Sequence, residues 1–360
     1  MPKTKKSIHS QLMIVLLVGI MLVAFTVILG MILSSKKSSS YVVKKDDNKN
    51  AEIVAPTFTA PLTGLPVSEE ISTRRPWAIV IENLPPIRPQ SGLSAADIVF
   101  EAPTEGGITR FLAIFQSQLP PSLIGPIRSA RPYFNDWSST FQALYSHSGG
   151  TSEALKQLKG GYGSLTDVNE FYNEHAYQRI VGKKAPHNLF TTAEKFWKYI
   201  TNLGWDKTST ATKLNFGTRL SDGTTATNFI IPYFPSEYAV RYDWRPNEKY
   251  YLRAVGGNTQ FDATTMEPIH VTNAIVMFTD IIPIPRDPLF KVNLTTIGSG
   301  KILLFTNGQK YQGLWSKPTL ESDLIFTDEA GNILPLTPGN TWISVVDNSL
   351  MNLIKTEPKE

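Results

Sequence analysis

Residues 97–115 read Asp97-Ile-Val-Phe-Glu-Ala-Pro-Thr-Glu-Gly-Gly-Ile-Thr-Arg-Phe-Leu-Ala-Ile-Phe115, with an apolar run on each side of a glycine pair. An apolar run of the same kind, Trp77-Ala-Ile-Val-Ile81, precedes them. Short, near-continuous apolar runs are typical of strands that are covered on both faces. We therefore expect buried strands over residues 77–81, 97–100 and 111–115.

Helix signals alternate with strand signals in the N-terminal half. Pro132 suits the first position of a helix that continues to about Leu144, because the N–H of that position has no helical partner in any case. Residues 143–147 are expected to form another strand. Thr151 is placed to cap a helix that ends at about Leu158, and Thr191-Thr-Ala-Glu194 has capping-box spacing ahead of a further helix.

The pattern changes at about Asn215, where helix signals give way to strands and turns. Turn signals such as Asp222-Gly223, Asn307-Gly308 and Gly298-Ser-Gly300 fall between short apolar runs. The expected strands cover residues 229–233, 238–244, 250–253, 274–278, 301–305, 310–315, 324–327 and 341–346. The sequence therefore predicts an α/β domain over residues 61–210, followed by a mostly β domain over residues 215–350.

A membrane anchor is expected near the N-terminus, after a short tail of residues 1–11. Residues 12–33 hold no charged side chain, and 22 helical residues reach roughly 33 Å, enough to cross a bilayer. A cleaved signal peptide is the alternative, but it has a shorter apolar region, and no Ala-x-Ala site follows Leu33. Lysines flank both ends of the span, so the positive-inside rule does not set its orientation.

Residues 34–60 are rich in Ser, Lys, Asp and Asn, which predicts either a flexible stalk or disorder without a spacing role.

Residues 1–45 hold seven lysines and no acid, which leaves 28 basic and 31 acidic side chains in the rest of the chain. We therefore expect no nucleic-acid partner, and contacts between the basic flanks and anionic lipid headgroups. The chain has no cysteine, which excludes disulfides, thiolate metal sites, a cysteine nucleophile and a lipid-modified N-terminal cysteine.

An anion site is the main functional expectation. Arginine forks suit phosphate or carboxylate, and glycine-rich turns at helix starts present free N–H groups to an anion. The candidate residues are Arg110, Arg128, Arg131, His147, Ser148, Gly149, Gly150, His187 and Asn188. The alternative is that the arginines pair with Glu82, Asp97, Glu101 or Glu105 in a structural ion network, while His187 and Asn188 bond to loop backbone.

No catalytic motif is present. Ser129 and Ser148 are possible nucleophiles, but the sequence lacks Gly-x-Ser-x-Gly and Ser-x-x-Lys, and it has no P-loop or dinucleotide fingerprint. The five histidines show no His-Glu-x-x-His spacing. We predict no catalytic residue, no metal site and no cofactor, and we favour a non-enzymatic role. Aromatic residues of 242–244 and 250–253 are expected in the core rather than on a sugar-stacking face.

Several runs occur together in a fixed order. They are Pro61-Leu-Thr-Gly-Leu-Pro66, Arg75-Pro-Trp-Ala-Ile-Val-Ile-Glu-Asn83, Arg88-Pro-Gln-Ser-Gly-Leu-Ser-Ala-Ala-Asp97, Glu105-Gly-Gly-Ile-Thr-Arg110, Gly125-Pro-Ile-Arg-Ser-Ala-Arg131, His147-Ser-Gly-Gly150 and Ala185-Pro-His-Asn-Leu189, with Tyr242-Asp, Tyr251-Leu-Arg253 and Gly313-Leu-Trp315 in the β half. Over residues 60–350 the chain resembles the YerB-like family of exported bacterial proteins, a domain of unknown function (DUF3048), with both its N-terminal and C-terminal domains.

The resemblance implies a bacterial surface protein, because many members are lipoproteins, and it places the C-terminal domains outside the cell membrane. It implies no activity and no catalytic residue. This chain departs from the family in lacking a lipobox cysteine, so its apolar span would replace the lipid. Two functions remain open. One is a non-enzymatic envelope module that binds cell-wall synthesis proteins, and the other is a ligand-binding or transferase domain for a phosphorylated, pyrophosphate-bearing glycan or lipid precursor.

Overall fold

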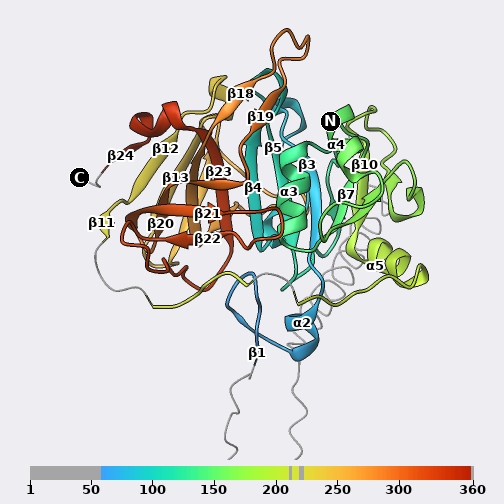
Figure 1. Cartoon of the computed structure of the whole chain (residues 1–360), viewed down its shortest axis with the longest axis horizontal. Coiled ribbons are helices and arrows are strands. Elements are labelled where there is room, and N and C mark those ends of the chain that lie inside the picture. Colours follow the sequence, from blue (N-terminus) through green and yellow to red (C-terminus); the bar gives the residue numbers. More distant parts are fainter. Residues whose placement is uncertain (1–57, 211–212, 219–222, 358–360) are drawn as a thin grey trace, which may run out of the picture. The chain divides into compact units, whose positions relative to one another are not determined.

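The computed structural model describes residues 58–210, 213–218 and 223–357, which make up one compact unit (Figure 1). The expected tail, the expected anchor over residues 12–33 and most of the expected stalk lie outside the described residues. Within those three ranges, no helix is long and apolar enough to span a membrane. The last residues of the expected stalk, Phe58–Thr59, form strand β1, which pairs with β2 (Pro66–Val67).

A sheet of 11 strands combines both halves of the chain. In spatial order its strands are β11 (Thr224–Thr225), β21 (Gln309–Lys317), β20 (Gly298–Thr306), β17 (Asn273–Thr279), β23 (Thr341–Asp347), β4 (Ile98–Pro103), β5 (Thr109–Phe115), β3 (Trp77–Glu82), β7 (Leu144–His147) and β8 (Thr166–Asn169), with β22 (Ile325–Thr327) beside β21. The apolar runs that the sequence analysis selected are therefore strands, and those over 77–81, 97–100 and 111–115 are buried on both faces.

Strand β23 joins the two halves. It lies between β17 and β4 and runs parallel to both, with Ile343 opposite Ile275 on one side and Phe100 on the other. The first part of the chain is α/β and the C-terminal part is rich in β structure. Strands from both of the residue ranges that we predicted as domains nevertheless pair within this one sheet.

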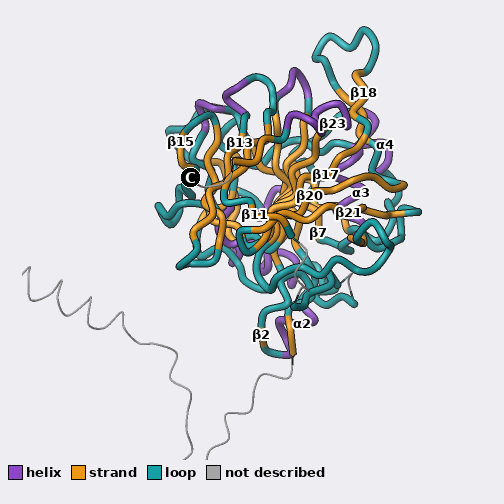
Figure 2. The backbone as a smooth tube through the Cα atoms, turned by 90° about the vertical axis from the view of Figure 1, so that its left-hand side faces the viewer, coloured by secondary structure: helices purple, strands orange, loops and turns teal. Residues whose placement is uncertain are grey.

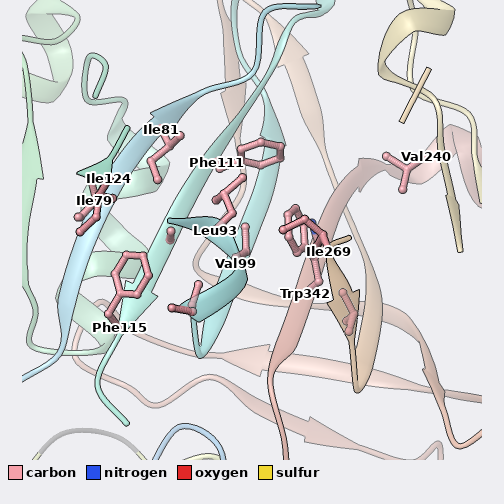
Figure 3. Close-up of a cluster of buried hydrophobic side chains, with 14 of the residues drawn as sticks. Ile79, Ile81, Leu93, Val99, Phe111, Phe115, Ile124, Val240, Ile269 and Trp342 are labelled. Carbon is pink, nitrogen blue, oxygen red and sulfur yellow. The ribbon is translucent and has the colours of Figure 1, made fainter. Parts of the chain in front are cut away.

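A second, 6-stranded sheet is formed by the C-terminal part alone. Its strands are β15 (Asn258–Thr259), β14 (Tyr250–Val255), β13 (Val240–Arg245), β12 (Asn228–Ile231) and β24 (Lys355–Glu357), with β16 (His270–Val271) beside β14. One hydrophobic cluster contains residues of both sheets, among them Phe111, Trp342 and Val240 (Figure 3). The smaller strands are β6 (Leu123–Ile124), β9 (Gln178–Arg179) and β10 (Leu189–Thr192) in one sheet, and β18 (Ile281–Pro283) with β19 (Val292–Leu294) in a hairpin (Figure 2).

The described residues form helices α2 (Glu69–Thr73), α3 (Pro132–Thr140), α4 (Ser152–Leu158) and α5 (Ala193–Asn202). Helices α3 and α5 pack on the large sheet, whereas α2 buries none of its residues. Trp137 of α3 stacks on Phe100 at 4.5 Å between ring centres, and Phe196 of α5 stacks on Trp77 at 4.0 Å. These two pairs belong to different hydrophobic clusters, so α3 and α5 pack on different sides of the sheet.

Three local predictions were wrong in detail. The helix that begins at Pro132 ends at Thr140, because Gln142 has a left-handed backbone (φ 49°) that turns the chain into β7. Thr192, not Thr191, caps α5, because the Thr192 hydroxyl accepts from the N–H of Lys195, while the Thr191 hydroxyl donates to the carbonyl of Ala176. Residues 298–300 start β20 rather than a turn, because Gly300 pairs with Trp315 of β21.

A buried ion pair links the two sheets. Arg253 of β14 donates to Glu101 of β4, and both side chains are inaccessible to solvent. The remaining donors of the guanidinium reach Tyr242 and Gln260, and its centre lies 4.2 Å from the ring centre of Trp342. Burial lowers the pKa of Arg253, but the charges and hydrogen bonds of Glu101 and Tyr242 together outweigh this effect and raise the pKa overall. The pair is therefore fully hydrogen-bonded, as a buried charge must be to be tolerated.

We expect Arg253→Met to lower the free energy of unfolding by about 3–5 kcal/mol, because Glu101 would be left buried without a partner charge. Urea denaturation followed by circular dichroism measures this loss. The double variant E101Q/R253M is the control, and it should recover part of the loss because it leaves no unpaired charge. A single variant as stable as the unmodified chain would contradict the role of the pair.

Candidate functional site

Arg110 and Arg131 meet around one carboxylate. Arg110 Nη2 lies 2.9 Å from Glu105 Oε1, and Arg131 Nη2 lies 2.5 Å from Glu105 Oε2. Both arginines also donate to the backbone oxygen of Ser129. Burial by itself would raise the pKa of Glu105, but the positive charges of Arg110 and Arg131 lower it to about 2. Glu105 is therefore ionised at neutral pH, and the trio carries one surplus positive charge.

Arg128 faces a different acid. Its Nε lies 3.3 Å from Oε1 of Glu82, a side chain that is only 3% exposed. The other oxygen of Glu82 lies 2.8 Å from Nδ1 of His187. Arg128 and His187 thus approach from separate segments. They converge on an internal carboxylate.

The glycine motif at residues 147–150 is also occupied by neighbouring groups. Both ring nitrogens of buried His147 face oxygen acceptors, Gly149 O at 2.7 Å and Asp167 Oδ1 at 2.8 Å. The N–H of Gly149 donates to Asn169. Ser148 donates to Glu170. The histidine has no free nitrogen for catalysis, and these hydrogen bonds do not leave the expected anion-binding amide free.

Asn188 completes this internal network, because its side-chain oxygen accepts from Arg179, which also pairs with Glu170. The slot beside Arg131 and Glu105 has a volume of about 10 Å³, roughly the space of one water molecule. The structure thus brings the predicted arginines close to internal acids. In this arrangement the slot has no room for a phosphate group. Anion binding by these residues stays a prediction.

The aromatic residues of 242–244 and 250–253, which were predicted for the core, are buried or partly buried. Tyr242 and Tyr251 are buried, and Phe229 stacks on Tyr242 at 4.7 Å between ring centres. Trp244 is partly buried and packs against Tyr251 at 5.0 Å. None of these three rings therefore forms an open face on which a sugar could stack.

Among the described residues, no group of three or more His, Cys, Asp or Glu side chains could hold a metal ion.

An exposed apolar surface was missed by the sequence analysis. It is formed by Phe234, Ile282, Leu289 and Phe290, which we call the tip surface. Their side chains are 83%, 58%, 61% and 74% exposed. Three of the four belong to the segment from β18 to β19, which projects from the top of the molecule in Figure 1. The run Ile-Ile-Pro-Ile-Pro over residues 281–285 was a signal that could have identified it.

The backbone holds this surface together at the glycine pair of residues 106–107. The N–H of Gly106 donates to the carbonyl of Phe290 at 3.2 Å. Gly107 has φ 78°, and a Cβ atom there would lie 2.6 Å from the carbonyl oxygen of Phe234. Phe290 itself has φ 54°, a left-handed conformation that is costly for a bulky residue. The fold thus accepts backbone strain at a side chain that remains in solvent.

These features define a class: a two-part α/β and β protein with an arginine network paired to internal acids and an exposed aromatic surface. Residues 62–206 match the model described as "Protein of unknown function (DUF3048) N-terminal domain", and residues 229–343 match "Protein of unknown function (DUF3048) C-terminal domain". The chain therefore belongs to the DUF3048 family, as the resemblance predicted.

The matched relatives agree with this assignment. The chain is 35% identical over 297 residues to "Putative lipoprotein YerB" of Bacillus subtilis (strain 168), an alignment that covers 81% of this chain and 87% of the relative. The crystal structure of the YerB protein from Bacillus subtilis superposes with a TM-score of 0.74 at 32% identity, covering 84% of this chain and all of that one.

Replacing Glu105 tests the ion network through the pH dependence of stability. Because the pKa of Glu105 falls from an ordinary 4.5 to about 2, its contribution is complete above pH 4.5 and is lost as the pH falls towards 2. We expect the unmodified chain to lose about 2 kcal/mol through this group between pH 5 and pH 3. Glu105→Gln should remove this loss and be less stable at pH 7, because two buried arginines lose their acid. Urea titrations at each pH measure both effects.

Asp97 provides a control, because its contribution to stability changes with pH in the opposite direction. Burial raises its pKa to about 6 despite hydrogen bonds from Ser117 and the N–H of Gln116. Its contribution is therefore complete below pH 3.8 and is lost as the pH rises through 6. The difference in stability between Asp97→Asn and the unmodified chain should change over this higher range. An identical low-pH loss in Glu105→Gln and the unmodified chain would contradict the ion network.

Proposed function

We propose that this chain is a tethered, non-enzymatic interaction module of the bacterial cell envelope. In this proposal residues 12–33 span the cell membrane and the folded part lies outside it. The apolar run of residues 12–33 supports the anchor, and a relative described as a putative lipoprotein supports attachment to a membrane. A lipid and a spanning helix both tether a domain, although a helix does so far more firmly. This chain has no cysteine to carry a lipid.

The single observation that carries the proposal is the tip surface. Scattered exposed apolar residues are ordinary, but large side chains gathered on one surface mark a contact site. The backbone carbonyls of Phe234 and Phe290 lie at the same glycine pair although 56 residues separate them in sequence. Aromatic anchors of this kind supply much of the energy at protein interfaces.

The tip surface lies far from the end of the folded part at which the described chain begins. The described chain begins at Phe58, and in both views the β18–β19 hairpin lies at the opposite end from β1 and β2 (Figure 1, Figure 2). Exposed Arg286 at the hairpin tip forms no ion pair within the described residues, so an apolar groove with an acidic rim on an envelope protein fits this surface.

The alternative function is binding or transfer of a pyrophosphate-bearing glycan or lipid precursor. One observation favours it: Arg110 and Arg131 share one carboxylate and leave one positive charge unbalanced. Binding would require Glu105 to move away and open the slot, because the slot now holds about one water molecule. The interaction module requires no such rearrangement and is therefore the better-supported proposal.

Photo-cross-linking in the native cell tests the tip surface. A photoreactive phenylalanine at position 290 should give one discrete protein adduct, and Phe234→Ser in the same chain should reduce that adduct at least about tenfold, as expected for an interface anchor. Phe171 is the matched control, since it is aromatic, 66% exposed and packed on Gly149 instead. Equal adducts from positions 290 and 171 would contradict a specific docking surface.

The anchor is tested by a variant that lacks residues 1–34. It should move from the membrane fraction to the soluble fraction while keeping the circular dichroism of its folded part, because only the apolar span is removed. In intact cells stripped of their wall, added protease should digest the folded part of the unmodified chain. Protection from protease would place the folded part inside the cell and contradict the proposed topology.

A further inference from the structure

A short loop of residues 104–108, which we call the glycine loop, lies between the arginine network and the tip surface. Its base is closed by Thr104, whose N–H and hydroxyl both donate to the carbonyl of Ile108, at 2.7 and 3.0 Å. On one side the glutamate of the loop pairs with the arginines. On the other side an N–H of its glycine pair reaches the tip hairpin, residues 281–294. One loop of five residues therefore contacts both features.

The carboxylate of Glu105 is held at both of its oxygens. Nε and Nη2 of Arg131 lie 3.0 and 2.5 Å from Oε2, and Nη2 of Arg110 lies 2.9 Å from Oε1. The arginines are themselves fixed, because they donate to the backbone carbonyls of Ser129 and Ala130. Arg110 belongs to β5 of the large sheet, and Arg131 precedes α3. Since a forked arginine contact also sets geometry, Glu105 is held in one position relative to the sheet.

The two residues that follow Glu105 have no side chain by which the fold could hold them. Gly106 has φ 62° and Gly107 has φ 78°, left-handed values that glycine adopts readily. A Cβ atom at Gly106 would meet no other atom within 4 Å, so packing does not fix this residue. Because glycine is the most permissive residue, the pairing of Glu105 is the nearest side-chain constraint on the direction of the Gly106 N–H.

The outer part of the tip hairpin, residues 284–291, depends on this N–H. Within the described part of the chain, the bond from Gly106 to the carbonyl of Phe290 is its one hydrogen bond to the rest of the protein. Its other bonds are internal, such as the ion pair of Lys291 with Asp287 at 3.0 Å. Strands β18 and β19 likewise pair only with each other. Release of the glycine loop would therefore free the part of the hairpin that carries the exposed apolar side chains.

We propose that Arg110, Glu105 and Arg131 form a clamp that orders the tip surface before it docks, an inference that rests on the interaction function proposed above. The clamp fixes the glycine loop, and the loop holds the backbone of Phe290 beside that of Phe234. The three clamp residues are positioning residues, because they do not touch the partner. An ordered surface binds more tightly, since less conformational entropy is lost on docking. The clamp also gives the paired arginines a role that requires no external anion.

Hydrogen exchange of the full chain in lipid nanodiscs tests the clamp without a partner. Glu105→Gln removes the charge that the arginines hold, so the amides of residues 104–108 and 284–291 should exchange at least about tenfold faster, with a smaller change in β3. Arg131→Gln should have the same effect. Arg179→Gln is the matched control, because its ion pair with Glu170 does not involve the glycine loop, and it should leave both segments unchanged. Unchanged exchange of residues 284–291 in Glu105→Gln would overturn the proposal.

Photo-cross-linking in the native cell tests the consequence for docking. With a photoreactive phenylalanine at position 290, Glu105→Gln should reduce the adduct about three- to tenfold, because the docking arrangement becomes a minor fraction of the population. Asp97→Asn makes the same acid-to-amide change at a buried carboxyl that bonds to Ser117 instead, and it should leave the adduct unchanged.

Thermal melting of each variant confirms that it is folded. Equal adducts in Glu105→Gln and the unmodified chain would overturn the clamp but leave the tip surface supported. The absence of any adduct in the unmodified chain would overturn the interaction function itself, and with it the proposed role of the clamp in docking.

Discussion

The contact between Glu101 and Arg253 is the constraint on which the packing of the two sheets depends. It lies where a strand of the N-terminal half faces a strand of the second sheet, and both charges are out of solvent. A buried pair tolerates almost no displacement, because its attraction must offset the loss of hydration of two ions. Tyr242, Gln260 and Trp342 surround the guanidinium, so residues from three separate segments must meet in one arrangement.

The buried arginines of the N-terminal half likewise need partner charges. Arg110 is 5% exposed and Arg131 is 8% exposed, so each needs an acid nearby. Glu105 pairs with both of these arginines, while Glu82 pairs with Arg128 and His187. The sequence feature that suggested an anion site is therefore also what a structural network requires. Only the positions of the carboxylates separate these two interpretations.

The proposed binding surface lies at the periphery of this rigid interior. Three of the four residues of the tip surface are carried by a hairpin outside the two large sheets. Loops and element ends tolerate strain and exposed apolar atoms better than the sheets do, which is why binding sites are often found there. A partner at the tip surface could therefore be accommodated without disturbing the buried charges.

The sequence by itself determined the class of elements and the family. The apolar runs at 77–81 and 111–115 predicted buried strands correctly, because continuous apolar character leaves few alternatives to burial. Thr151 caps its helix as expected. Tertiary structure decided the rest. Strand β23 pairs with β4 across more than 240 residues, which no local pattern encodes. The pairing of the arginines with acids likewise depends on long-range packing, and so does the placement of the Phe234 and Phe290 backbones at Gly106–Gly107. The sequence shows which residues are charged or apolar, but only the assembled sheets place them in space.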